Sequence, residues 1–157
     1  MPNTQIDTII LPVDGSTGSL RAAKLAATLA HNAHVPLEIV FAFPRDALEM
    51  FGPPGVDSGN EHLQYMAPGA FEELRKNRAG KVFQRARQEI ADFVDLDISE
   101  QVVNGQPAQA ILKHVETKTN PMIVIGSRGA SAFRELMLGS VSQKLVHHAR
   151  CPVTVVH

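Results

Sequence analysis

The sequence is poor in the residues that stabilise small secreted domains. It has no tryptophan, a single tyrosine and a single cysteine, Cys151, among 157 residues. One cysteine cannot form an internal disulfide, which excludes a disulfide framework. Because Cys151 stands beside Pro152 at the start of an apolar run, we expect it to be a small buried side chain in a reducing compartment.

The chain also lacks a strong net charge, a basic leader and a long apolar run. Its formal net charge is −1, so nothing global attracts it to nucleic acid or to an anionic membrane surface. Residues 1–15 carry no lysine or arginine, and their apolar stretch is far too short to cross a bilayer. We therefore expect a cytoplasmic protein that neither binds nucleic acid nor inserts into a membrane.

The length and the apolar content suit one globular domain spanning residues 1–157, because 44% of the residues are hydrophobic. Five apolar runs are short and nearly continuous, and they occupy residues 6–13, 37–43, 98–103, 122–125 and 153–156. Runs of this kind are typical of strands that are buried on both faces of a parallel sheet.

Helical patterns separate these runs. Apolar residues recur at helical spacing in three segments: Ala22, Leu25, Ala26, Leu29 and Ala33; Ala79, Val82, Phe83, Ala86 and Ile90; and, opened by Pro107, Ala108, Ile111, Leu112 and Val115. A fourth helix is predicted to begin at a Ser-x-x-Gln capping box over residues 140–143, with Ser140 as its N-cap. The alternation predicts a three-layer, doubly wound, Rossmann-like α/β domain with right-handed crossovers.

Residues 44–68 do not fit this alternation. Prolines and glycines interrupt the segment, and a structureless stretch of this length is unusual in a compact domain. Its apolar side chains, which include Met50, Phe51, Tyr65 and Met66, are too many for a simple linker. Because the segment directly follows the second strand, we expect a mobile flap near the carboxyl edge of the sheet.

The apolar run 122–125 leads directly into a glycine-rich segment. Residues 126–140 read GSRGASAFRELMLGS, which places Gly126, Gly129, Gly139 and Ser140 in a Gly-x2-Gly-x9-Gly-Ser pattern. Glycine has no Cβ, so backbone N–H groups at a strand-to-helix turn can come close to a phosphate. The pattern favours a phosphate or nucleotide site, although a tight strand-to-helix turn without a ligand would use the same glycines.

The position of Asp14 suggests a second part of that site. In an open α/β sheet, ligands bind at the carboxyl ends of the strands where the direction of winding reverses. If the fourth strand returns to lie beside the first, Asp14 and Gly126 flank the reversal. Asp14 can then accept hydrogen bonds from ribose hydroxyls, while the glycines and Ser140 surround phosphates at the start of the last helix.

Simpler roles exist for several of these residues. Asp14 could instead cap the first helix, for which Ser16 and Thr17 are equally good candidates. Arg128 either contacts a phosphate or is a solvated loop charge. The histidine pairs at 31 and 34 and at 147 and 148 lack a cysteine pair or a carboxylate at matching helical spacing, so we interpret them as surface or interface histidines and expect no metal site.

With these motifs the sequence resembles the universal stress protein family, in its ATP-binding branch. The resemblance covers nearly the whole chain. It rests on Leu-Pro-Val-Asp-Gly-Ser at 11–16, the glycine pattern at 126–140, Asn-Gly-Gln-Pro-Ala at 104–108 and Cys-Pro-Val-Thr-Val-Val at 151–156. It implies a five-stranded parallel sheet in the order 3-2-1-4-5, of the adenine nucleotide alpha hydrolase-like type, and a homodimer.

The resemblance also implies how ATP would lie, with Mg²⁺ accompanying its phosphates. The adenine would contact Ala42, Pro12 and Val13, and the ribose would contact Asp14. The phosphates would lie against Gly126, Arg128, Gly129, Gly139, Ser140, Val141 and Ser142. Two features depart from the family pattern: the length of 44–68, and Asn120-Pro121 where an Ala-Asp pair is usual. Neither touches the phosphate loop.

The sequence favours a binding module over an enzyme. It lacks the Walker pattern Gly-x4-Gly-Lys-Ser/Thr and a Ser-Gly-Gly-x-Asp-Ser pyrophosphatase loop, and residues 126–140 contain no lysine. Phosphoryl transfer usually needs such a lysine, a carboxylate for Mg²⁺ and a group that positions the nucleophile. We expect a stress-response signalling module whose nucleotide occupancy modulates binding to an unidentified protein partner.

Two alternative functions stay open, a slow ATP-hydrolysing enzyme and a dimeric adaptor that binds no nucleotide. In either case we expect the homodimer to form through Val153–Val156, because a short, apolar, uncharged edge strand is a template for pairing.

Overall fold

The computed structural model describes residues 5–53, 60–127 and 138–157, and its centre is a five-stranded parallel sheet. The strands are β1 (Thr8–Pro12), β2 (Leu37–Phe43), β3 (Ile98–Asn104), β4 (Pro121–Gly126) and β5 (Val153–Val156). They lie in the order β3-β2-β1-β4-β5, and every neighbouring pair is parallel. The predicted order is confirmed. The predicted ends of β1, β3 and β4 were wrong by one or two residues.

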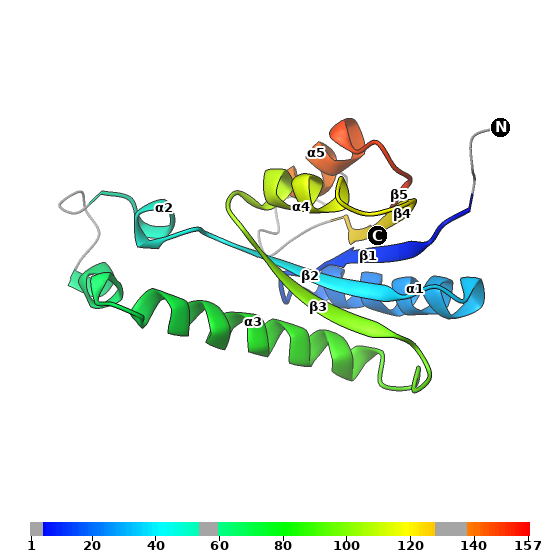
Figure 1. The fold of residues 1–157 in the computed structure, drawn as a ribbon, viewed down its shortest axis with the longest axis horizontal. Helices are drawn as coiled ribbons and strands as arrows, with labels where there is room; N and C mark the ends of the chain where they lie inside the picture. Colours follow the sequence, from blue (N-terminus) through cyan, green and yellow to red (C-terminus); the bar gives the residue numbers. More distant parts are fainter. Residues whose placement is uncertain (1–4, 54–59, 128–137) are drawn as a thin grey trace.

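Helices cover both faces of this sheet (Figure 1). Helices α1 (Thr17–Ala33) and α3 (Ala70–Glu89) pack on one face, and α4 (Pro107–Val115) and α5 (Ser140–His148) pack on the other. The doubly wound, three-layer architecture is therefore confirmed. Pro107 is the first residue of α4, as expected of a proline whose missing N–H would have had no helical partner.

The two-sided covering explains why the strand sequences are continuously apolar. Side chains alternate between the faces of a strand, so Ile9 and Leu11 join the core beneath α1 and α3, while Ile10 joins the core beneath α4 and α5. In β2, Ile39 and Val40 divide between the two cores in the same way. Both sets are removed from water, as expected of inner strands that are covered on both faces.

Helix α1 presents a strip of alanines to the sheet. Its fully buried apolar residues are Ala22, Ala23, Ala26, Ala27 and Ala30, whereas Leu25 and Leu29 are only partly buried and Ala33 is exposed. Of the predicted stripe, Ala22 and Ala26 are confirmed as fully buried, Leu25 and Leu29 pack against the same core, and only the prediction of Ala33 was wrong. Small side chains let the helix axis come close to the sheet.

The segment 44–68 contains more secondary structure than expected. It includes α2 (Ala47–Phe51) and a 3₁₀ helix, η1 (Asn60–Met66), so its described part is not structureless. The mobility of this segment stays a prediction. The Asp46 carboxylate caps α2 by accepting a hydrogen bond from the N–H of Glu49, at 2.8 Å. The rings of Phe51 and Tyr65 stack with centroids 5.4 Å apart and so join the two helices. In Figure 1, α2 lies beyond the carboxyl end of β2.

Within the described ranges, no helix combines the length and the apolar character that a membrane span requires.

Candidate functional site

A cavity of about 300 Å³ opens at the carboxyl edge of the sheet, where β1 and β4 lie side by side and the chain winds away in opposite directions. It is lined by Pro12, Val13, Asp14, Ser19, Ala42, Pro107, Ile111, Ile125, Gly126, Gly139, Ser140, Val141 and Ser142. Every predicted site residue that the structure describes is in this lining. Arg128 and Gly129 lie outside the described residues.

Four lining residues were not predicted: Ser19, Pro107, Ile111 and Ile125. Pro107 and Ile111 belong to the first turns of α4, which follows β3 at the same edge of the sheet. Helices that follow parallel strands all begin at that edge, so the predicted start of α4 was a sufficient signal to include them. They add apolar side chains to the lining that also contains Ala42.

The hydrogen bonds in the loop between β1 and α1 show which residue caps α1. The hydroxyl of Ser16 accepts a hydrogen bond from the N–H of Ser19 at 3.2 Å, so Ser16 is the N-cap and Asp14 and Thr17 are not. Asp14 Oδ1 accepts a hydrogen bond from the N–H of Ser16 at 2.9 Å. This short turn holds an exposed carboxylate at the rim of the cavity.

Gly126 is required by packing. A Cβ atom at this position would lie 2.6 Å from the carbonyl carbon of Gly18 and 2.7 Å from its oxygen, which is closer than real Cβ contacts. The end of β4 therefore touches the backbone of the first turn of α1. The glycine pattern favours the approach of a phosphate here, with a tight turn as the alternative, and the contact with Gly18 is a reason for glycine that holds without any ligand.

The start of α5 differs from the predicted capping box. Gly139 is the N-cap and Ser140 is already helical, so the prediction of Ser140 as N-cap was wrong. The Ser142 hydroxyl lies 3.0 Å from the carbonyl oxygen of Ser127 and 2.9 Å from that of Gly139, and it donates to this backbone. The N–H of Gly139 also donates to Ser127, at 2.6 Å. These bonds join the two ends of the segment 128–137.

The N-termini of three helices converge on the cavity. Ser19 in the first turn of α1, Pro107 at the start of α4 and Ser140 at the start of α5 all line it. The first N–H groups of a helix have no partner within the helix, and the helix dipole is positive at this end. Gly139 has no side chain with which to cap α5, so these N–H groups are suited to an anionic ligand.

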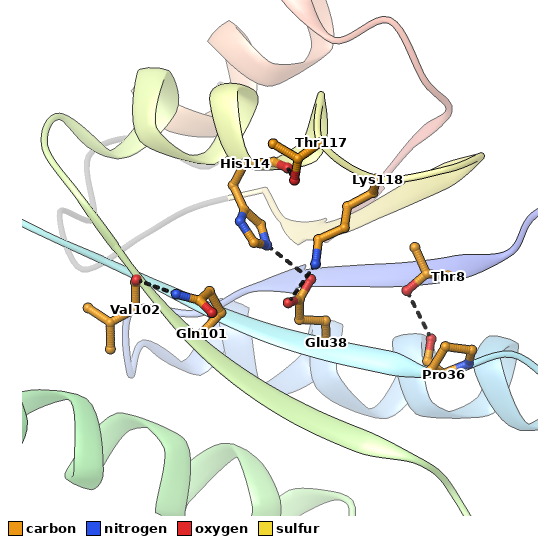
Figure 2. Close-up of polar contacts among 8 residues, drawn as sticks. All are labelled: Thr8, Pro36, Glu38, Gln101, Val102, His114, Thr117 and Lys118. Atoms are coloured by element: carbon orange, nitrogen blue, oxygen red, sulfur yellow. Dashed lines mark hydrogen bonds and ion pairs between the residues drawn. The ribbon is translucent and has the colours of Figure 1, made fainter.

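A second polar group lies on the same face of the sheet but near the amino end of β2 (Figure 2). Glu38 is buried, and its carboxylate contacts Nε2 of His114 and Nζ of Lys118, each at 3.0 Å. His114 is in the last turn of α4, and Lys118 follows the helix. The sequence does not predict this cluster, because Glu38 lies within an otherwise apolar run and its partners are about 80 residues away.

Cys151 is half-buried and packs against the core beneath α4 and α5. Burial raises the pKa of its thiol, because the charged thiolate is poorly solvated there. The thiol is therefore held in its protonated, less reactive form.

Comparison with known proteins identifies a family for this chain. Residues 5–157 match the universal stress protein family. The chain is 30% identical over 151 residues to universal stress protein YxiE of Bacillus subtilis, covering 94% of this chain and 97% of the relative.

Solved structures give the same result. The universal stress protein UspA from Lactobacillus plantarum superimposes with a TM-score of 0.66 at 21% identity, covering 99% of this chain and 100% of that one. A universal stress protein in complex with cAMP superimposes with a TM-score of 0.61 at 26% identity, covering 98% of each chain. Motif, strand order and relatives agree, and the chain belongs to the universal stress protein family.

Proposed function

We propose that this protein is an adenine-nucleotide-binding module of the stress response, with ATP as its cellular ligand. The observation that carries the proposal is the cavity between β1 and β4, at which three helix N-termini and the Asp14 carboxylate meet. A positive helix end suits a phosphate, and a carboxylate suits a ribose hydroxyl. The relative that binds cAMP, at 26% identity over nearly the whole chain, supports an adenine nucleotide.

The lining suggests an orientation for the ligand. The apolar wall of Ala42, Val13 and Ile111 suits the flat face of a base. Asp14 at the rim is placed to accept hydrogen bonds from the ribose. The first N–H groups of α5, at Ser140, Val141 and Ser142, would serve the phosphates. The Ser142 hydroxyl donates to the backbone carbonyls of Ser127 and Gly139, so this residue would contact a phosphate through its N–H. Arg128 and Gly129, which lie outside the described residues, stay predicted phosphate contacts, and Mg²⁺ would accompany the phosphates of ATP.

The size of the cavity is consistent with a small organic ligand. Its volume of about 300 Å³ is at the lower end of the range for ligand sites, roughly 300 to 1,000 Å³. A nucleotide would fill it with the base and the ribose, and the phosphates would extend toward the start of α5.

The described part of the lining favours binding over catalysis. Asp14 is its only ionisable side chain, and it contains no lysine, arginine or histidine. Phosphoryl transfer requires cations on the phosphates and a group that positions the nucleophile. We propose a nucleotide-regulated binding protein with at most slow hydrolysis. A steady-state rate above about one ATP per second per subunit, within the range of true kinases, would favour the enzyme alternative.

We further propose a cytoplasmic homodimer whose nucleotide occupancy changes its affinity for a protein partner. The support is the apolar edge strand β5, whose residues Val153–Val156 are all half-buried in the single chain.

Two measurements test the nucleotide proposal. Mass spectrometry of small molecules that co-purify with the native protein should detect an adenine nucleotide. Calorimetry with AMP, with cAMP and with ATP plus Mg²⁺ should give saturable heat, and each ligand should raise the unfolding temperature by mass action. Absence of both heat and shift at millimolar nucleotide would favour the dimeric adaptor that binds no nucleotide.

A further inference from the structure

The loop that carries Asp14 is held from outside the cavity by helix α3. Nη1 of Arg85 donates a hydrogen bond to the carbonyl oxygen of Gly15 at 2.8 Å, although the two residues are 70 positions apart. A Cβ atom on Gly15 would lie 3.6 Å from Nη1 of Arg85 and 3.6 Å from Cγ2 of Val82. Helix α3 is thus in direct contact with the turn that follows β1.

This hydrogen bond acts on the same peptide group that holds Asp14. The carbonyl of Gly15 and the N–H of Ser16 belong to one peptide unit, which is planar, so fixing one end fixes the other. The oxygen end accepts from Arg85 at 2.8 Å, and the N–H end donates to Asp14 Oδ1 at 2.9 Å. Gly15 has φ +81°, a conformation that other residues rarely adopt, so the peptide orientation is a specific feature of this turn.

We infer that Arg85 is a positioning residue for ribose recognition: it fixes the Gly15–Ser16 peptide, whose N–H holds the Asp14 carboxylate at the rim of the cavity. Arg85 itself is not part of the cavity lining. Its cationic donor also polarises the peptide and strengthens the N–H···O bond at the other end. The inference rests on the proposed nucleotide function and adds a residue that determines specificity for the sugar.

The test compares a ligand that has ribose hydroxyls with one that lacks them. The probes are AMP and 2′,3′-dideoxyadenosine monophosphate, titrated by calorimetry into the wild type, Arg85→Ala, Arg85→Lys and Arg78→Ala. Arg78 is an exposed arginine of the same helix, so Arg78→Ala matches the change in charge and in helix composition. Loss of one charge-assisted hydrogen bond should weaken AMP about fivefold in Arg85→Ala. The affinity for the dideoxy nucleotide should change by less than about twofold.

Two comparisons separate positioning from a general structural effect. Arg85→Lys keeps a cationic donor and should recover more than half of the discrimination between the two nucleotides. In Asp14→Ala the discrimination is already lost, so adding Arg85→Ala should cause little further loss, because the two residues act through one peptide.

A measurement without ligand completes the design. Hydrogen exchange of the Ser16 amide should be faster in Arg85→Ala than in Arg78→Ala, because its hydrogen bond to Asp14 is loosened. Unchanged exchange, an unchanged ratio of the two affinities, or equal loss of both nucleotides in Arg85→Ala would each overturn the inference. If the wild type binds neither nucleotide, the proposed function fails and ribose positioning fails with it. If the wild type binds AMP and Arg85→Ala behaves like Arg78→Ala, only the role of Arg85 fails.

Discussion

Oε2 of Glu38 lies 3.0 Å from Nε2 of His114, and this contact ties the last turn of α4 to the amino end of β2. A carboxylate in a strand interior is costly to bury unless it is paired. Here the cost is offset by His114 and by Lys118, whose side chains are 15% and 30% exposed. On the same face of the sheet, Val40 and the register partner Ile10 are fully buried, so the cluster is a polar clamp within an apolar layer.

Glu38→Ala should destabilise the protein by about 2 to 3 kcal/mol, because removal of the buried carboxylate leaves the partly buried Nε2 of His114 and Nζ of Lys118 without their partner. Urea unfolding measures the change. Glu100→Ala is the matched control, because Glu100 pairs with Arg87 at a more exposed site of the neighbouring strand. That loss should be below about 1 kcal/mol. Similar losses for the two variants would show that the clamp contributes no more than a surface pair.

Gly126→Ala should destabilise the protein by about 1 to 3 kcal/mol, because the added methyl group meets the backbone of Gly18 and α1 must shift away. Gly80→Ala is the control in the opposite direction. Gly80 lies in α3 with open space around it, and alanine should stabilise that helix by about 0.5 to 1 kcal/mol. Thermal unfolding of both variants gives the comparison. If Gly126→Ala retained wild-type stability, close packing would not be the reason for the glycine.

The contrast between these glycines shows what the sequence could and could not predict. The strands were found because continuous apolar runs identify a sheet covered on both faces, and most of the lining followed because parallel strands end at one edge. Gly126 was predicted as a site residue and lines the cavity. Its contact with Gly18 depends on how closely α1 approaches β4, and no local sequence pattern encodes that distance. The same approach explains why Ala23 and Ala27 are fully buried, whereas Leu25 and Leu29 are only partly buried.

Two other differences have equally local causes. Ser140 was expected as the N-cap because serine is favoured there, but Gly139 already has the extended backbone of a cap, and the helix begins one residue earlier. The Glu38 clamp joins residues far apart in the sequence, and its partners on α4 become visible only when the helix is placed on the sheet.

Asp14→Ala should weaken AMP by about tenfold while changing the affinity for inorganic triphosphate by less than about twofold, because only the nucleotide offers ribose hydroxyls to the carboxylate. Competition calorimetry with both ligands measures the difference. Since Ser16 caps α1 through its own hydroxyl, the helix should stay intact, which circular dichroism checks. Equal weakening of both ligands would instead indicate that Asp14 acts only in shaping the turn.

Cys151 should react slowly with iodoacetamide at pH 8. Burial raises the pKa of its thiol, so a smaller fraction is thiolate in the folded protein than in the unfolded chain at the same pH. The alkylation rate, followed by mass spectrometry, should be at least about threefold lower in buffer than in urea. A folded-state rate that equals the rate in urea would show that the thiol is not protected.

Val155→Lys should convert the proposed dimer into a monomer. The two edges of the sheet differ: β3 exposes Ser99, Glu100 and Gln101, whereas β5 carries Val153–Val156. Charged and polar residues discourage pairing at an edge, and short apolar strands invite it. Pairing of β5 with its symmetry mate would bury the valines across a two-fold axis and bring two introduced lysines close together.

Sedimentation velocity at micromolar concentration should show a dimer for the wild type and for Gln101→Lys, which places the same charge on the other edge. Val155→Lys should sediment as a monomer and still bind AMP, because Val155 is outside the cavity lining. A dimeric Val155→Lys, or loss of the dimer in Gln101→Lys alone, would move the interface away from β5. A monomeric wild type would mean that this apolar edge is covered by something other than a second copy of the chain.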